Sequence, residues 1–210
     1  MTEEAKSRVR EHAQAGVRLR EHFFAENTDL IVDVARTLAL CLARGGKILF
    51  CGNGGSAADA QHLAAEFVNR FVIDRPPLAA IALTTDTSIL TAIGNDFDYN
   101  QIFSKQVQAL GVPGDVLVGI STSGNSENIV RAFLAAQENS LTTIGITGRN
   151  GGNLAPLSDM LINVPEQSTA LIQEIHITVG HLLCRLVDYF LFQNALALEP
   201  YLDGGSARGD

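Results

Sequence analysis

Five short apolar runs recur along the chain, each followed by a polar or glycine-rich segment. They cover residues 47–51, 79–83, 116–120, 142–146 and 160–164. Uninterrupted runs of this length are typical of strands buried on both faces of a parallel sheet. Segments with helical periodicity lie between these runs, at 57–69, 99–110 and 126–138, and after the last one, at 170–196. The pattern predicts an α/β fold, a three-layer sandwich in which helices flank a five-stranded parallel sheet, as in flavodoxin-like and Rossmann-like proteins.

Two helices are expected before the first strand. Residues 2–24 form a charged amphipathic segment, and Asn27 or Thr28 is a candidate N-cap for a second helix that ends at Gly45-Gly46. We expect these helices to pack outside the core or against a neighbouring subunit. The chain then divides into N-terminal helices (1–45), a core domain (46–197) and a flexible tail (198–210), one domain overall.

Charge and composition narrow the choice of partner and compartment. The formal net charge is −8 and the sequence pI is about 5.1, which argues against nucleic acid or an anionic membrane as partner. No apolar run reaches ~18 residues, so no membrane span is predicted. The N-terminus does not resemble a secretory signal, and the three cysteines lie in apolar stretches. Buried thiols of a cytoplasmic protein are the expectation.

The first glycine-rich loop, Gly52-Asn53-Gly54-Gly55-Ser56, lies between a strand and a helix. That arrangement directs backbone N–H groups and a helix dipole at an anion. The loop formally matches a dinucleotide fingerprint, but Asp86 comes too late to bind a ribose, and no P-loop lysine is present. A simple tight turn remains the alternative.

The second polar loop carries four hydroxyl groups within six residues, at Ser121, Thr122, Ser123 and Ser126. It also lies between a strand and a helix, with Ser126 as the natural N-cap. Hydroxyls in such loops sometimes satisfy only local backbone groups. Three of them besides the cap favour a neutral cradle for a phosphate group.

Metal-binding and acid–base residue types occur on two predicted helices. His62 and Glu66 are four residues apart and share one helical face. Gln173 and His181 lie about 80° apart around the last long helix, whereas His176 lies about 140° from His181 and faces elsewhere. Two histidines, a glutamate and a glutamine offer nitrogen and oxygen donors that suit zinc, although glutamine is an uncommon ligand.

The segments 51–56, 59–66, 93–96, 119–126 and 173–176 together resemble phosphoheptose isomerases of the sugar-isomerase (SIS) domain superfamily. The resemblance extends in order over about residues 30–190, and it weakens in the 70–78 segment and after about Phe192. It implies a cytoplasmic homotetramer with sites near subunit contacts. It also implies conversion of D-sedoheptulose 7-phosphate to D-glycero-D-manno-heptose 7-phosphate through an enediol, the first step of nucleotide-heptose biosynthesis for lipopolysaccharide.

The resemblance assigns roles to individual residues of this chain. The implied ligands of one Zn²⁺ per subunit are His62, Glu66, Gln173 and His181. The implied substrate contacts are Asn53, Gly54, Gly55, Glu66, Asn95, Asp96, Ser121, Thr122, Ser123, Ser126 and Gln173. For catalysis we expect Glu66 to act as the base and His181 as the acid, although a tightly held metal ligand is a poorer base.

Two non-enzymatic alternatives remain at this point. Some SIS relatives are tetrameric scaffolds, like DiaA, that bind the replication initiator DnaA, and they resemble this chain less at Glu66 and His181. A phosphosugar-sensing regulator would need a DNA-binding segment, and none is visible in this sequence. The complete set of histidine, glutamate and glutamine residues favours the enzyme.

Overall fold

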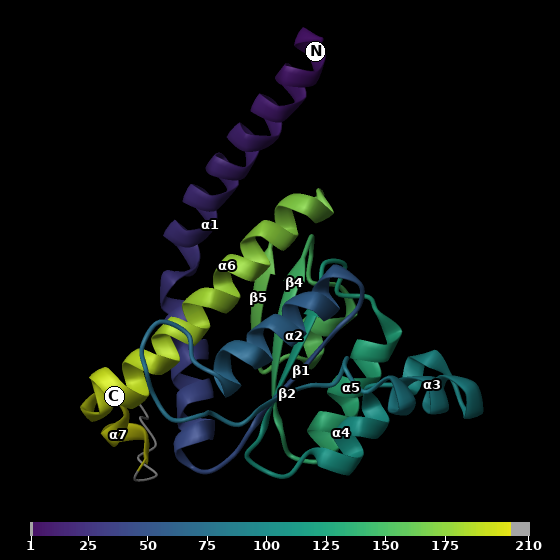
Figure 1. Ribbon diagram of the computed structural model, residues 1–210, viewed down its shortest axis with the longest axis vertical. Coiled ribbons are helices and arrows are strands. Elements are labelled where there is room, and N and C mark those ends of the chain that lie inside the picture. Colours follow the sequence, from purple (N-terminus) through teal and green to yellow (C-terminus); the bar gives the residue numbers. More distant parts are fainter. Residues whose placement is uncertain (1, 203–210) are drawn as a thin grey trace.

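A five-stranded parallel sheet runs through the middle of the structure, with helices on both faces (Figure 1). The computed structural model describes residues 2–202. The strand order is β2-β1-β3-β4-β5, so the predicted sheet is confirmed. The strands are β1 (Ile48–Gly52), β2 (Ala80–Ala82), β3 (Val116–Ser121), β4 (Thr142–Gly148) and β5 (Met160–Val164). The helices are α1 (Glu3–Ala43), α2 (Gly55–Val68), α3 (Thr87–Asp96), α4 (Ser104–Leu110), α5 (Glu127–Glu138), α6 (Thr169–Asp188) and α7 (Glu199–Leu202), with short 3₁₀ turns η1 (Tyr99–Gln101), η2 (Gly152–Leu157) and η4 (Ala195–Leu198) and a π-helical turn η3 (Tyr189–Gln193).

Alternation along the buried strands divides the core into two layers. In β1, Ile48 and Phe50 join the cluster packed under α1, α2 and α6, whereas Leu49 and Cys51 join the cluster under α4 and α5. Successive side chains of a strand point to opposite faces, and the central strands β1 and β3 supply apolar residues to both layers. This explains why β1 and β3 read as continuous apolar runs in the sequence.

The N-terminal region is one helix of 41 residues, and the prediction of two helices is wrong. Asn27 and Thr28 do not cap a second helix. Their side chains donate to the carbonyls of Phe23 (2.8 Å) and Phe24 (2.6 Å), four residues earlier. Polar side chains that bond back to the preceding turn leave the helix intact. The C-terminal half of α1 packs in the core and its first turns extend past the body, while His12 and Arg20 between them bond to Glu174 and Thr178 of α6 (Figure 1).

Most other predicted elements are present with shifted ends. Helix α2 starts at Gly55, and the helix expected over 99–110 is divided into η1 and α4. The segment Thr169–Gln193 has the length and mean hydropathy (1.3) of a membrane span, but half of its most apolar window is buried in the protein. It is the central helix of the α1–α2–α6 layer. Of the tail expected from residue 198, residues 199–202 are helical and residues 203–210 lie outside the described part.

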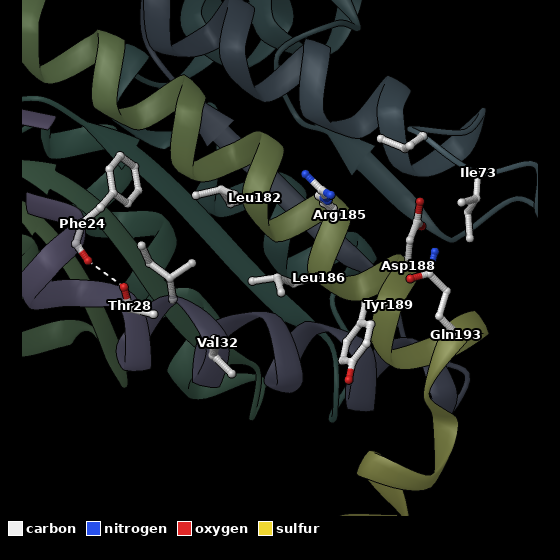
Figure 2. A pocket seen from close by; sticks show the side chains of 12 residues that line it. Phe24, Thr28, Val32, Ile73, Leu182, Arg185, Leu186, Asp188, Tyr189 and Gln193 are labelled. Carbon is white, nitrogen blue, oxygen red and sulfur yellow. Dashed lines mark hydrogen bonds between the residues drawn. The ribbon is translucent and has the colours of Figure 1, made fainter. Parts of the chain in front are cut away.

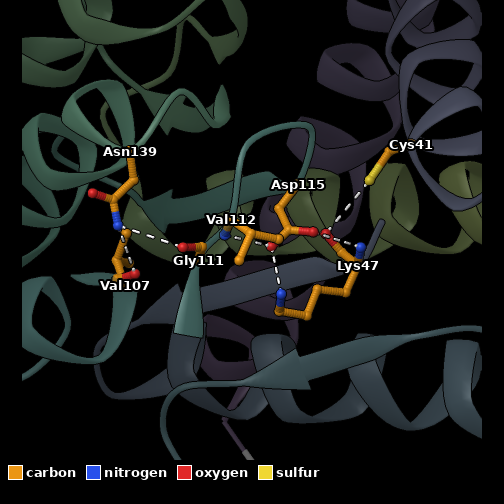
Figure 3. Close-up of polar contacts among 7 residues, drawn as sticks. All are labelled: Cys41, Lys47, Val107, Gly111, Val112, Asp115 and Asn139. Carbon is orange, nitrogen blue, oxygen red and sulfur yellow. Dashed lines mark hydrogen bonds and ion pairs between the residues drawn. The ribbon is translucent and has the colours of Figure 1, made fainter. Parts of the chain in front are cut away.

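Buried polar groups fix the amino ends of the strands, opposite the polar loops. Asp115, with a side chain 1% exposed, accepts hydrogen bonds from the backbone N–H groups of Lys47 and Val112, both at 2.9 Å. It also forms an ion pair with the Lys47 ammonium (Figure 3). Asp115 therefore joins the start of β1 to the turn before β3. All three cysteines are buried and unpaired, as the sequence predicts.

We expect Asp115→Asn to lower the free energy of unfolding by about 2–3 kcal/mol, because the amide cannot accept from all three donors and leaves buried groups unpaired. Urea denaturation would measure this. Glu4→Gln is the matched control, since the Glu4–Arg8 pair is exposed, and it should change stability by less than about 0.5 kcal/mol. Equal effects of the two substitutions would contradict the role given to Asp115.

Candidate functional site

The two polar loops start from adjacent strands at the carboxyl edge of the sheet. Strands β1 and β3 are paired, with Gly52 opposite Ile120, and the chain leaves them toward opposite sides of the sheet. Ligands of open α/β sheets bind at such a switch point. The fold therefore places loops 52–56 and 121–125 side by side where an anion site is expected.

The second loop forms a cluster of hydroxyl groups. The Ser121 hydroxyl lies 3.1 Å from the Ser126 hydroxyl and 3.5 Å from the Ser123 hydroxyl, and it accepts from the Gly124 N–H. Ser126 occupies the N-cap position of α5, as expected, but its side chain makes no capping bond and points to Ser121 instead. Its hydroxyl is thus directed toward the other hydroxyls at the start of a helix, where an oxyanion is favoured.

Asn53 connects the first loop to α5 through residues that the sequence did not reveal. Its carboxamide exchanges two hydrogen bonds of 2.9 Å with the buried Asn128 and accepts from the Tyr99 hydroxyl at 3.1 Å. Asn128 lies two residues after Ser126, so this pair holds the two loops together. Its position in the first turn of α5 is the only sequence signal for it.

Gly55 and Gln173 bring the first loop against α6. A Cβ atom on Gly55 would lie 2.7 Å from Gln173 Nε2, closer than real Cβ contacts occur. Glycine at this position therefore lets the glutamine side chain reach the loop. Gln173, predicted both as a metal ligand and as a substrate contact, thus lies beside the first loop.

Helices α2 and α6 approach closely where the two predicted histidines lie. A Cβ on Gly180 would be 2.6 Å from Leu63 Cδ2, so a larger residue here would force the buried Leu63 side chain or the helices to shift. The next residue, His181, places its Nε2 atom 2.9 Å from His62 Nε2, with the rings edge to face. Residues 119 positions apart are thus brought into hydrogen-bonding contact.

The surroundings of the histidine pair are acidic on one side and aromatic on the other. Glu66 Oε1 lies 3.5 Å from His62 Nε2. The ring of Phe71 stacks on His181 with centroids 5.4 Å apart. Burial raises the pKa of the Asp59 carboxyl, while His62 and His181 lower it in part. Phe71 and Asp59 were not predicted; Phe71 lies in the segment where the family resemblance is weak.

The fit of a zinc ion rests on the spacing of these donors. Two ligands on a tetrahedral zinc lie about 3.3 Å apart, given bond lengths of about 2.0–2.1 Å. The His62–Glu66 spacing matches, and the histidine pair must open by only a few tenths of an ångström. Within residues 2–202 no group of three or more His, Cys, Asp or Glu side chains already has metal-binding geometry. Two spacings, His62 to Glu66 and His62 to His181, therefore suit the ion, whereas the Gln173 amide lies against Gly55.

Asn95 and Asp96 are not brought to this site within one chain. They lie at the end of α3, are both exposed, and hydrogen-bond each other at 2.7 Å. Figure 1 shows α3 at the side of the molecule away from α6. Asp86 caps α3 by accepting a hydrogen bond from the Ile89 N–H, so its role is structural and requires no bound nucleotide.

His176 faces away from the histidine pair, as its helical position predicts. The side chain is buried, and its Nε2 lies 2.9 Å from the carbonyl of Thr147 at the end of β4. Burial lowers the pKa of His176 to about 4, although the hydrogen bond to Thr147 raises this pKa by a smaller amount. The ring is therefore a neutral structural donor near pH 7.

Comparison with known proteins gives a consistent result along nearly the whole chain. Residues 11–148 match the SIS domain family. The chain is 65% identical over 204 residues to the phosphoheptose isomerase of Nitratidesulfovibrio vulgaris, covering 97% of this chain and 98% of that protein. It is 60% identical to the phosphoheptose isomerase of Desulfovibrio desulfuricans over the full length of both.

Solved structures agree. The phosphoheptose isomerase of Neisseria gonorrhoeae superposes with a TM-score of 0.83 at 49% identity, covering 88% of this chain and 98% of that chain. The phosphoheptose isomerase of Francisella tularensis gives a TM-score of 0.86 at 38% identity, covering 90% and 99%. All four relatives carry the name of an enzyme, so these comparisons give no support to the initiator-binding scaffold.

We expect the buried His176 to make stability fall on acidification. Between pH 6.5 and about 4 the unfolded chain binds a proton at His176 that the folded protein does not bind. The contribution of His176 to the free energy of unfolding is therefore fully present above pH 6.5 and is lost as the pH falls toward 4. His176→Gln should reduce the slope of unfolding free energy in this range by up to about 1.4 kcal/mol per pH unit. Urea titrations at several pH values test this, with the exposed His22→Gln as control. An unchanged slope in His176→Gln would refute it.

Proposed function

The chain belongs to the phosphoheptose isomerase family of SIS-domain proteins, and from that premise we propose that it interconverts D-sedoheptulose 7-phosphate and D-glycero-D-manno-heptose 7-phosphate. It is a phosphosugar isomerase, an enzyme. The observation that supports the proposal most is the meeting of His62, Glu66 and His181 on two helices, in a fold whose hydroxyl loop lies at the sheet's switch point.

The phosphate group is assigned to the second loop. Ser121, Thr122, Ser123 and Ser126 offer neutral donors at the start of α5. A net charge of −8 means that the anion must be held by such local dipoles and not by the charge of the whole protein. Asn53, Gly54 and Gly55 are assigned to the sugar hydroxyls, since the Asn53–Asn128 pair holds the first loop beside the second.

Proton transfer is assigned to Glu66 and His181. In the ketose, the Glu66 carboxylate removes a proton from C1, the C1–C2 enediol forms, and the proton returns at C2 to give the aldose. His181 protonates or relays a proton at the sugar oxygens, a role that its Nε2 atom can fill only while no metal ion is bound to it. The stacked Phe71 ring limits rotation of that imidazole. A stable ring orientation matters because a general acid must be within hydrogen-bonding reach of its target.

A zinc ion is proposed on His62, Glu66 and His181, with Gln173 as a fourth ligand. When bound it would polarise the substrate carbonyl and stabilise developing negative charge. If both histidines held the ion through Nε2, their mutual hydrogen bond would have to break. The test is to remove metal by dialysis against a chelator, to equilibrate the protein with zinc, and to measure the zinc bound. Protein that binds no zinc after this equilibration would contradict the site.

We also propose that the protein is a homotetramer. The His62 side chain is 46% exposed, yet enediol chemistry requires water to be excluded. An apolar groove of about 620 Å³ lies between α1 and α6, lined by Phe24, Val32, Leu182 and Leu186 (Figure 2). A second copy would cover such surfaces, and α3 of a neighbour would supply Asn95 and Asp96. Light scattering of the purified protein tests this, and a monomer at micromolar concentration would contradict it.

The remaining assignments follow from the family. We propose that the enzyme acts in the cytoplasm, in the first step of nucleotide-heptose biosynthesis for lipopolysaccharide or related surface glycans, with neither nucleic acid nor membrane as partner. The acidic composition agrees with this.

We expect Glu66→Gln to reduce turnover of sedoheptulose 7-phosphate by at least about 100-fold, because the amide cannot accept the C1 proton. An assay of aldose formation with purified protein measures this. Gln61→Glu is a control on an exposed neighbouring position, whose amide donates a hydrogen bond to the carbonyl of Thr84. Near-normal turnover in Glu66→Gln, with circular dichroism unchanged, would remove Glu66 from the role of base.

A further inference from the structure

Arg75 lies in the connection between α2 and β2, and its guanidinium is almost completely buried, 1% exposed. Nε donates to Asp188 Oδ1 at 2.7 Å. Nη2 donates to the carbonyl of Glu66 at 3.0 Å, and Nη1 donates to the carbonyl of Phe67 at 2.8 Å. One side chain therefore binds the last turn of α2 and the last residue of α6 together.

The geometry of these bonds suits arginine in particular. The last carbonyls of a helix have no partner within the helix, and here the planar guanidinium supplies donors to two of them. Asp188 fixes the guanidinium from α6, seven residues after His181 and therefore about two turns away. The residue whose carbonyl is bound is Glu66, the proposed base itself.

The same connection also contacts the proposed acid. Phe71, four residues before Arg75, stacks on the His181 ring with an interplanar angle of 20°. The segment between α2 and β2 thus touches the backbone of Glu66 at one point and the imidazole of His181 at another. Neither contact is made by residues that the family resemblance assigned to the site.

Stability alone does not account for the Arg75–Asp188 pair. Buried ion pairs often contribute little net stability, because desolvation offsets their attraction. The second oxygen of Asp188 is buried without a hydrogen-bond partner, so the pair is not arranged for the greatest stability. Its distinctive feature is that it joins the last turn of α2, which carries Glu66, to the end of α6, about two turns beyond His181.

We propose that Arg75 is a positioning residue of the isomerase: by joining the Glu66 carbonyl to Asp188, it sets the separation of the Glu66 and His181 side chains. The proposal rests on the proposed function for its kinetic consequence. Arg75 does not touch the reacting atoms and acts through the backbone of α2. A small displacement of a catalytic group is enough to cost about 10²-fold in rate.

The test uses Arg75→Lys in the full-length protein. Lysine keeps the charge but cannot donate to Asp188, Glu66 and Phe67 at once. We expect kcat for sedoheptulose 7-phosphate to fall about 10- to 100-fold while KM changes by less than about 3-fold, since the hydroxyl loop is untouched. The imidazole ¹⁵N resonances of His62 and His181 should shift in the same variant.

Asp115→Asn is the matched control, because it breaks a buried ion pair at the opposite edge of the sheet. It should lose stability yet keep kcat within about 2-fold at temperatures well below its unfolding transition. If Arg75→Lys does not fold, Asp188→Asn takes its place, because the asparagine keeps an acceptor for Arg75. We expect kcat to fall less in Asp188→Asn than the roughly 10- to 100-fold expected for Arg75→Lys.

Each outcome decides the proposal. Normal kcat in a folded Arg75→Lys, or an equal loss in Asp115→Asn, would overturn it. If the wild-type protein does not convert the sugar phosphate, the proposed function fails instead, and the imidazole resonances decide the positioning role alone. Resonances unchanged by Arg75→Lys would then overturn it, and resonances shifted there but not in Asp115→Asn would support it.

Discussion

The close approach of α2 and α6 is the constraint on which the rest of the site depends. Gly180 leaves the space of a Cβ open for the side chain of Leu63, so the Leu63 side chain of α2 packs against the backbone of α6. The residues next to this contact, His62 and His181, are consequently within hydrogen-bonding distance. Tight packing of this kind is stiff, because a well-packed interior tolerates little added volume. A weaker contact would leave two exposed histidines on separate helices and no common donor set.

The sheet contributes the second part of the site through its topology. Strands β1 and β3 are neighbours, but the chain continues from them in opposite directions, and both polar loops therefore emerge at one place. Asn53 and Asn128 connect these loops, and Gln173 connects the first loop to α6. The predicted phosphate end and the predicted proton-transfer end are thus joined by a continuous set of contacts. Buried groups such as Asp115 hold the opposite edge of the sheet and leave the carboxyl edge free for function.

Sequence reasoning succeeded where local pattern decides the structure and failed where distant contacts decide it. The five strands were predicted because short apolar runs such as 116–120, separated by helical segments, are typical of strands buried in a parallel sheet. The spacing of His62 and Glu66 likewise indicated one helical face. The predicted helix break near Asn27 was wrong because asparagine occurs both at the N-cap of a helix and inside helices, where its side chain bonds to the preceding turn. Asn128, Phe71 and Arg75 could not be found, since their partners lie on other elements and follow from no spacing in the sequence.

The most direct measurement is the turnover and structure of Gly180→Ala. The account predicts that the added methyl group displaces α2 from α6, separates the Nε2 atoms of His62 and His181, and lowers kcat by at least about 10-fold with little change in KM. Shortening the opposing side chain with Leu63→Ala in the same protein should restore part of the loss, as expected for two residues in contact. A folded Gly180→Ala enzyme with wild-type turnover and an unchanged histidine pair would contradict the account.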